Sequence, residues 1–395
     1  MISVNEALKI ILSTTGNFGE ETVPLKDAFN RVLAEDVFAD RDSPPFNRVM
    51  MDGIAIDSSV LSLQNTEVFF IESIQAEGDA PKILSDKNNS IEVMTGAVLP
   101  LNTDTIIPYE NMEIIDQRAT IKEPIIAKKF IHWQGRDHKK NELSIVKYKL
   151  LSAAHIGLLA SIGIADVPVL KLPKIAIVAT GNELVAVNEI PLDHQIRMSN
   201  VYTLQAALQG DNIAADIFHI IDEEAELFIQ LSNIITNYDV VLISGGVSKG
   251  KYDFVPDILQ KIGVEKLFHR VAQKPGKPFW FGQQALLKTH VFAFPGNPIS
   301  TFVCFHYYFR QWLFASLKMA LKFSLIPLSQ EIFPNNNLDQ FIPVVLNDLG
   351  TEVVATSNNG SGDLMSLANI DGFIFLPKGE EKYLEKNKFL FIKVV

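Results

Sequence analysis

The chain has 395 residues, of which 47% are hydrophobic and 21% charged, and its formal net charge is −11. This length corresponds to two or three domains, and the composition is that of a globular protein, which excludes a disordered or fibrous chain. The acidic balance argues against a nucleic-acid partner, because such proteins neutralise many phosphates with Lys and Arg. An anionic substrate must therefore be captured by a local cluster of basic residues.

The single cysteine, Cys304, excludes an intramolecular disulfide and a thiolate zinc site and indicates a reducing compartment. The first residues carry no basic region followed by an apolar run, so no signal peptide is predicted there. The most apolar stretch, residues 302–328, is interrupted by basic side chains and is predicted to be a buried aromatic helix rather than a membrane span. We therefore expect a cytoplasmic protein with no membrane partner.

The N-terminal part is predicted to be a helical domain that a β-rich insert interrupts. Ser3 and Glu6 have the spacing of a capping box, and a second helix is predicted after Pro24, with apolar residues at helical spacing up to Leu33. Short β-like runs separated by turn residues follow, and a helix returns at residues 152–162. The predicted helical domain is residues 1–45 and 137–172, and the predicted insert is residues 46–136.

From Lys174 onward, strands alternate with helices, which predicts a doubly wound parallel sheet. Strands are predicted at residues 174–179, 213–221, 239–243 and 291–294, and helices at residues 200–209 and 222–237. The tail contains further β-like runs at residues 341–346, 352–355 and 373–376. The predicted fold is a multidomain α/β protein with a central α/β domain at residues 173–322 and a C-terminal β domain at residues 323–395.

Three strands of the central domain end in glycine-rich turns, where backbone amides can bind anionic oxygens. Ligands of open α/β sheets bind outside the carboxyl ends of the strands, so the three turns predict one binding crevice. The turns are Thr180-Gly181-Asn182-Glu183, Gly245-Gly246-Val247-Ser248 and Pro295-Gly296-Asn297.

Charged residues gather near the same strand ends. The segment Lys274-Pro275-Gly276-Lys277 holds two lysines on a proline-stiffened loop, where a phosphate could bind at little entropic cost. The acids Glu183, Asp222 and Asp253 are candidate Mg²⁺ ligands, because carboxylates beside phosphates commonly bind this ion. An equally good interpretation of Asp222 is a helix N-cap.

Two short motifs have other possible meanings. Residues 245–251 have the spacing of a phosphate-binding P-loop, but Tyr252 stands where the Mg²⁺-binding Ser or Thr would be. Residues 246–250 match the nucleophile elbow of α/β-hydrolases, with Asp257 and His290 in the right order to complete a triad. The missing hydroxyl makes the P-loop interpretation weak, and in the second motif Ser248 is as easily a phosphate-contacting hydroxyl as a nucleophile.

An ordered set of motifs along nearly the whole chain resembles the molybdopterin molybdotransferases, the MoeA family, which includes the E domain of gephyrin. The motifs are Pro44-Pro45-Phe46 with Met51-Asp52-Gly53, Thr95-Gly96-Ala97, Gly135-Arg136-Asp137, Thr180-Gly181-Asn182-Glu183-Leu184, Ser199-Asn200, Gly245-Gly246-Val247-Ser248, Tyr252-Asp253, Lys274-Pro275-Gly276-Lys277-Pro278, Pro295-Gly296-Asn297-Pro298 and Gly360-Ser361-Gly362.

The resemblance implies a central domain of the molybdenum-cofactor-binding type in a homodimer, with each cleft shared between the subunits. It implies insertion of molybdate into adenylylated molybdopterin with release of AMP and a requirement for Mg²⁺. A molybdopterin adenylyltransferase would supply the substrate.

The resemblance also assigns roles to residues. Asp52, Glu183, Asp253, Lys274 and Lys277 would be catalytic, and Glu183, Asp222 and Asp253 would surround the metal. Asp52 would come from the partner subunit. The substrate-binding set would comprise Thr95, Asp137, Thr180, Gly181, Ser199, Asn200, Gly245, Gly246, Val247, Ser248, Pro275, Gly276, Pro295, Gly296 and Asn297.

The chain departs from the family pattern at several charged positions. Asn182 replaces an acid, Lys249 and Lys251 add positive charge, and Arg197 stands where an acid is common. His132 occupies a position where a basic residue is expected. These changes predict a more positive cleft with a weaker or differently placed cation.

Two other classes of function remain open at this point. One is an adenylyl-transferring or nucleotide-cleaving enzyme of the same fold, which would not explain the insert or the C-terminal match. The other is a non-catalytic binding scaffold, against which the acids and lysines of the crevice argue.

Overall fold

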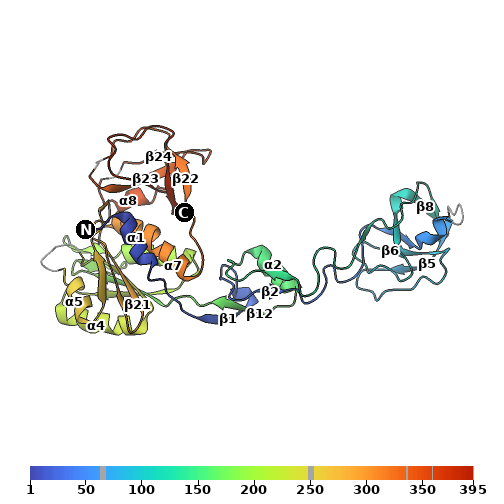
Figure 1. Ribbon diagram of the computed structural model, residues 1–395, viewed down its shortest axis with the longest axis horizontal. Coiled ribbons are helices and arrows are strands. Elements are labelled where there is room, and N and C mark those ends of the chain that lie inside the picture. The colour runs from blue at the N-terminus through green and yellow to red at the C-terminus, as the bar shows by residue number, and fades with distance from the viewer. Residues whose placement is uncertain (63–67, 248–252, 335–336, 358, 395) are drawn as a thin grey trace. The chain divides into compact units, whose positions relative to one another are not determined.

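The computed structural model describes residues 1–62, 68–247, 253–334, 337–357 and 359–394 (Figure 1). The chain forms two compact units. Unit 1 comprises Met1–Ala34, Tyr148–Leu151 and Pro168–Val395, and unit 2 comprises Glu35–Lys147 and Ser152–Val167. The four-domain division expected from the sequence is finer than this two-way division and stays a prediction.

Unit 1 is built on a six-stranded sheet with the order β16-β13-β17-β21-β20-β18. The first four strands are parallel and the last two pair antiparallel, which confirms the predicted doubly wound arrangement. The strands are β13 (Ile175–Thr180), β16 (Ala215–Ile220), β17 (Val240–Ser244), β18 (Glu265–His269), β20 (Trp280–Gln284) and β21 (Thr289–Phe294).

Alternate residues of the parallel strands enter two different cores, because side chains of a strand point to opposite faces of the sheet. Ile175 and Ile177 of β13 pack on one face with helices α1 (Val4–Leu12), α3 (Asn200–Gly210), α6 (Pro298–Cys304) and α7 (Arg310–Ser316). Ala176 and Val178 pack on the other face with α4 (Glu224–Asn237) and α5 (Val255–Lys261). Both faces are covered, as a parallel sheet requires.

The apolar stretch after residue 298 is helical, as predicted, but it is not one regular helix. A π-helical turn, η4 (Phe305–Phe309), lies between α6 and α7, and all five of its residues are buried. Cys304 precedes this turn and is fully buried, so it packs as a small core residue. The helical segment ends at Ser316, so the rest of the predicted stretch to residue 328 is turn and strand.

The C-terminal part of unit 1 is a second six-stranded sheet, with the order β19-β23-β25-β26-β22 and β24 paired with β23. Its strands are β19 (Gln273–Lys274), β22 (Ser324–Pro327), β23 (Asp339–Leu346), β24 (Val353–Ala355), β25 (Gly372–Leu376) and β26 (Lys388–Lys393), and α8 (Leu364–Leu367) lies before β25. Because β19 pairs in parallel with β23, the segment that carries Lys274 belongs to this sheet.

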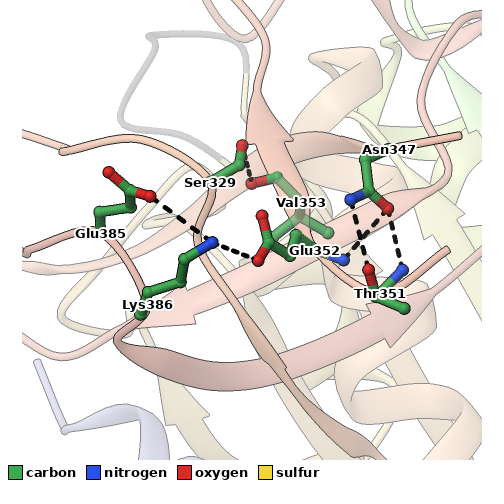
Figure 2. Close-up of polar contacts among 7 residues, drawn as sticks. All are labelled: Ser329, Asn347, Thr351, Glu352, Val353, Glu385 and Lys386. Carbon is green, nitrogen blue, oxygen red and sulfur yellow. Dashed lines mark hydrogen bonds and ion pairs between the residues drawn. The ribbon is translucent and has the colours of Figure 1, made fainter. Parts of the chain in front are cut away.

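Polar side chains hold the β23–β24 turn and the segment before β26 together (Figure 2). The Asn347 side chain accepts a hydrogen bond from the Thr351 amide at 2.9 Å, which closes the turn. Ser329 donates to the Val353 carbonyl at 3.0 Å, and Lys386 pairs with Glu352. This network fixes the edge of the C-terminal sheet.

The first residues of unit 1 confirm one predicted helix and contradict the other. Helix α1 starts at the predicted Ser3–Glu6 capping box. After β1 (Glu20–Pro24) there is only a short 3₁₀ turn, η1 (Leu25–Asp27), instead of a helix to Leu33. Asn30 has a φ of 58°, and Val32 and Leu33 form β-bridges to Leu150 and Val169. These long-range pairings outweigh the local helical spacing.

Two short strand pairs complete this part of the chain. β1 pairs with β12 (Asp166–Leu170), and β14 (Leu184–Val185) pairs with β15 (Ile196–Arg197).

Unit 2 confirms the predicted β-rich insert. Its main sheet has the order β7-β4-β6-β5-β9-β8, formed by β4 (Gly53–Ile56), β5 (Val68–Gln75), β6 (Ser90–Val93), β7 (Thr105–Pro108), β8 (Met112–Ile115) and β9 (Arg118–Ile121). Two short pairs and a helix complete it: β3 (Arg48–Val49) with β10 (Ile131–His132), β2 (Val37–Phe38) with β11 (Leu143–Ile145), and α2 (Ala153–Ser161). The 3₁₀ turns η2 (Ser58–Ser62) and η3 (Tyr109–Asn111) connect strands.

Among the residues that the structure describes, no helix has both the length and the apolar character that crossing a membrane requires.

Candidate functional site

The glycine-rich turns after β13 and β17 meet at the carboxyl edge of the central sheet. Gly245 has a φ of +107°, and a Cβ atom at this position would lie 2.7 Å from the Thr180 carbonyl oxygen, so only glycine permits this approach. Asn200, at the start of α3, donates to Ser244 Oγ at 2.8 Å and to the Gly296 carbonyl at 2.7 Å. The Asn200 amide therefore ties the end of β17 to the turn after β21.

These turns surround a small cleft of about 100 Å³, which we call the glycine-turn cleft. Six residues of the predicted site line it: Thr180, Glu183, Ser199, Asn200, Gly245 and Gly296. The buried hydroxyl of Thr180 has no hydrogen-bond partner among the described residues. A buried polar atom of this kind is commonly satisfied by water or a ligand.

The predicted acids Glu183, Asp222 and Asp253 interact electrostatically. Burial, and then the negative charges of Glu183 and Asp253, raise the pKa of Asp222 above its usual value. Asp222 Oδ1 is buried without a hydrogen-bond partner in the described part of the chain. The Asp222 amide donates to Asn182 Oδ1 at 3.0 Å, so the turns after β13 and β16 are joined. This environment favours a positive charge beside Asp222.

The interpretation of Asp222 as a helix N-cap is wrong. Helix α4 begins at Glu224, and the residue in its cap position is Glu223, whose side chain makes no capping hydrogen bond. In the described residues, no three His, Cys, Asp or Glu side chains lie close enough together to hold a metal ion by themselves. The three acids therefore do not form a complete metal site from protein ligands alone.

The predicted lysines line a second, larger cleft of about 490 Å³, which we call the lysine cleft. Its walls are the Lys274-Pro275-Gly276-Lys277 loop, the turn after β21 and the C-terminal part of unit 1, which contributes Gln340 of β23 and Ser361 of the segment before α8. Both lysines are exposed, and neither forms an ion pair with any residue that the structure describes. Two cations without a counter-ion on one concave wall attract an anion.

The turn between β21 and α6 separates the two clefts. Gly296 and Pro298 face the glycine-turn cleft, whereas Pro295 and Asn297 face the lysine cleft. Asn297 Nδ2 donates to Ser361 Oγ at 2.9 Å, and the Ile299 amide donates to the Ser361 carbonyl at 3.1 Å. The C-terminal domain thus holds the start of α6 in place.

Other predicted residues of unit 1 have different positions. Gly181 and Gly246 lie in the turns but do not line either cleft, and the Val247 side chain is buried in the core. Ser248, Lys249 and Lys251 lie outside the described residues, as does part of the P-loop-like segment.

The hydrolase interpretation is contradicted by the position of its histidine. His290 pairs with Val240 at the amino end of β21, whereas the glycine-rich turns follow the carboxyl ends at Ser244 and Phe294. A base at the opposite edge of the sheet cannot take a proton from a serine that follows β17.

Unit 2 carries the remaining predicted site residues. Asp52 Oδ1 accepts hydrogen bonds from the amide and hydroxyl of Thr95 at 2.6 and 2.8 Å, and these bonds lower the pKa of Asp52. Asp137 accepts from His132 at 2.8 Å, and the other ring nitrogen of His132 lies 3.0 Å from an Arg48 guanidinium nitrogen. Asp52 is thus held ionised on the surface of this unit.

Several residues around the clefts were not found from the sequence. His219 of β16 contacts the Gly181 carbonyl and His269 of β18 contacts the Val247 carbonyl, both at 3.0 Å, so the turns after β13 and β17 are each held by a histidine from another strand of the sheet. Ser300 and Gln340 line the lysine cleft. Ser361 is part of a motif that the sequence displays, but no local pattern shows that its domain folds against α6.

Three family models match the chain in succession. Residues 2–163 match the "MoeA N-terminal region (domain I and II)", residues 176–315 the "Probable molybdopterin binding domain", and residues 326–392 the "MoeA C-terminal region (domain IV)". The central match covers the sheet and all three glycine-rich turns. The fold and the two clefts therefore define an α/β protein of the molybdopterin-binding class.

Full-length relatives extend this result. The chain is 36% identical to a protein of Synechocystis sp. named molybdopterin molybdenumtransferase, over 97% of each chain. It is 28% identical to a protein of the same name from Staphylococcus aureus, over 97% of this chain and 93% of the relative. A crystal structure of a molybdopterin biosynthesis MoeA protein from Pyrococcus horikoshii has a TM-score of 0.84 and 26% identity and covers all of both chains. The chain belongs to the MoeA family.

Proposed function

We propose that the protein is a molybdopterin molybdenumtransferase that inserts molybdate into adenylylated molybdopterin and releases AMP. The names of its full-length relatives support this activity. The observation that carries the proposal is the lysine cleft, where two lysines without acidic partners among the described residues face a cavity at the carboxyl edge of a molybdopterin-binding sheet. Molybdate is a dianion, and this wall of the cavity suits it.

The mechanism is electrostatic. Cleavage of the phosphoanhydride of the substrate develops negative charge on the departing phosphate, and fixed cations and backbone amides stabilise that charge without reorganising. Lys274 and Lys277 supply the cations, and the turns after β13, β17 and β21 supply the amides. No side-chain nucleophile is required, so Ser248→Ala would slow the reaction without abolishing it.

A divalent cation such as Mg²⁺ fits beside Asp222. The raised pKa of Asp222 and its unpartnered buried oxygen show a local excess of negative charge that a cation would neutralise. Mg²⁺ usually takes one or two carboxylates and completes its coordination with water and substrate phosphates, so a complete protein cage is not needed. Asp222, Glu183 and Asp253 are the candidate ligands, and the bound ion would neutralise phosphate charge.

The active form is proposed to be a cytoplasmic homodimer in which Asp52, Thr95 and Asp137 of one subunit serve the cleft of the other. The hydrogen bonds from Thr95 keep Asp52 ionised, as a residue near a cation should be. A molybdopterin adenylyltransferase is the proposed donor of the substrate. Light scattering would test the dimer, and mixing Asp52→Asn with Lys277→Ala subunits would test whether a heterodimer recovers one intact cleft.

The activity is tested by measuring AMP release from adenylylated molybdopterin with and without molybdate. Release that requires molybdate supports the proposal. Release that is equally fast without molybdate would instead indicate a nucleotide-cleaving enzyme of the same fold. Tight binding of the substrate without turnover would indicate a scaffold.

A further inference from the structure

The Lys274-Pro275-Gly276-Lys277 loop rests on a buried polar side chain. Gln273, the residue before the loop, is fully buried. Its Nε2 donates to the Pro275 carbonyl at 2.9 Å and lies 3.6 Å from Cys304 Sγ. A glutamine amide without hydrogen bonds would be costly at this depth, so the conformation that satisfies Gln273 is strongly favoured.

The other end of the Gln273 amide is held by the π-helical turn. The Tyr308 hydroxyl donates to Gln273 Oε1, and Tyr308 is itself fully buried. Burial raises the pKa of Tyr308 well above its usual value, so the hydroxyl keeps the proton that it donates. A π-helical turn changes which side chains of a helix face a given neighbour, and such turns are frequent at functional sites.

The loop is seated closely on this pair. Gly276 has a φ of +89°, and a Cβ atom there would lie 2.5 Å from Gln273 Nε2 and 2.8 Å from Cys304 Sγ. The loop backbone therefore lies in contact with the Gln273 amide. Any shift of that amide must move the backbone between the two lysines.

One helical segment serves both sides of the lysine cleft. The first turn of α6 contributes Ile299 and Ser300 to the wall of the cleft, and the π-helical turn that continues α6 provides Tyr308. The same helical segment therefore forms part of the cleft wall and supports the loop that carries the two lysines. Interactions that fix charged groups before the ligand arrives are those that raise affinity and rate.

We propose that Gln273 and Tyr308 are positioning residues that set the location of Lys274 and Lys277 for an oxyanion. They do this through the hydrogen-bonded series from the Tyr308 hydroxyl to the Gln273 amide and on to the Pro275 carbonyl. This inference rests on the proposed function, because that function identifies the bound oxyanion as molybdate.

The first test is Tyr308→Phe, which removes one hydroxyl and keeps the ring. The matched control is Tyr307→Phe on the same turn, because the Tyr307 ring is also buried but its hydroxyl makes no hydrogen bond to a described residue. Titration calorimetry with molybdate measures anion binding without turnover. We expect Tyr308→Phe to weaken molybdate binding roughly five- to tenfold and the control to leave it within twofold.

The second test separates positioning from general stability. Gln273→Met preserves the volume of the side chain and removes its polar atoms. In the double variant with Tyr308→Phe, neither side chain is left with an unpartnered polar atom, and the Pro275 carbonyl is the group that loses its donor. Each change is also made in a Lys274→Ala/Lys277→Ala background. A positioning role requires that Tyr308→Phe have no further effect on molybdate binding or on the KM for molybdate once the lysines are absent.

The outcomes distinguish this inference from the proposed function. If the wild type binds molybdate, Tyr308→Phe weakens that binding and the wild type releases no AMP, the inference is supported and the proposed function is overturned. Molybdate-dependent AMP release with unchanged KM and binding in Tyr308→Phe and Gln273→Met overturns the inference alone. Equal losses with and without the lysines also overturn it, because the residues would then act only on stability. Wild-type protein that neither binds molybdate nor releases AMP overturns both.

Discussion

The two clefts of unit 1 hold their charges in opposite ways. In the lysine cleft, the cations are exposed, but the backbone that carries them is fixed by strand pairing to β23 and by the buried Gln273 amide. Of the three acids, only Glu183 lines the glycine-turn cleft, and the pKa of Asp222 is raised by burial and then by the negative charges of Glu183 and Asp253. The lysine cleft is therefore ready to receive an anion, whereas Asp222, outside the glycine-turn cleft, has a buried carboxylate oxygen without a partner among the described residues.

This difference shows which part of the site can bind its ligand without an added ion. Lysines need no added ion to bind an oxyanion, so a fixed loop is sufficient. Carboxylates that repel one another are stabilised only when a cation or a proton arrives. Removing the lysines should therefore weaken anion binding strongly, whereas removing an acid should relieve repulsion and weaken only the response to a cation.

The largest effect is expected from removing the lysines. Lys274→Ala and Lys277→Ala should each lower the rate of molybdate-dependent AMP release by about 10²-fold or more, since each deletes a fixed charge that stabilises the transition state. Lys171→Ala, an exposed lysine of the same unit, is the control and should behave as wild type. If Lys274→Ala and Lys277→Ala were as active as the control, the two lysines would not form the anion-binding site.

A smaller effect is expected from Asp222→Asn, which should stabilise the folded protein at neutral pH. The folded state raises the pKa of Asp222 above 3.8, so it holds that proton more tightly than the unfolded chain does. The stability contributed by the protonated form is full below pH 3.8 and is lost as the pH rises through the raised pKa. At pH 7 the ionised group therefore opposes folding, and Asp222→Asn should raise Tm by about 1–2 °C.

This gain in Tm should disappear as the pH falls toward 3.8. Added Mg²⁺ should raise the Tm of the wild type more than that of Asp222→Asn, because the ion binds the folded state through that carboxylate. The control is Asp193→Asn in an exposed loop, for which we expect neither effect. A variant that is less stable than the wild type at pH 7 would show that the carboxylate is structurally satisfied and not poised for a cation.

The same contrast separates what the sequence could predict from what it could not. The strand ends and the lysine loop are local patterns, and the structure brings them to one edge of the sheet. The segment after Pro24 has helical spacing as well, yet Val32 and Leu33 pair with residues more than a hundred positions later. Local periodicity predicts an element only where no distant strand competes for the same backbone.

The supports of the site were harder to predict than its charges. Gln273 and Tyr308 are 35 positions apart, and their contact depends on the irregular turn between α6 and α7. Ser361, in the segment between β24 and α8, contacts Asn297 across 64 positions of the chain. A sequence motif shows which residues carry charge, but the packing that positions them is a tertiary property.

The smallest effect tests whether the C-terminal domain matters to the lysine cleft. Ser361→Ala removes the oxygen that accepts from Asn297 Nδ2 and should lower turnover roughly threefold, the value of one net hydrogen bond. Ser329→Ala is the matched control, because its hydroxyl bonds to the Val353 carbonyl in the same domain (Figure 2). Neither Ser329 nor Val353 lines the lysine cleft. Loss of turnover in Ser361→Ala alone would show that this domain positions the wall of the cleft. Equal losses of turnover in both variants would show that the C-terminal domain contributes only stability. The Ser329 hydrogen bond can affect the β21–α6 turn only by changing the stability of the domain as a whole.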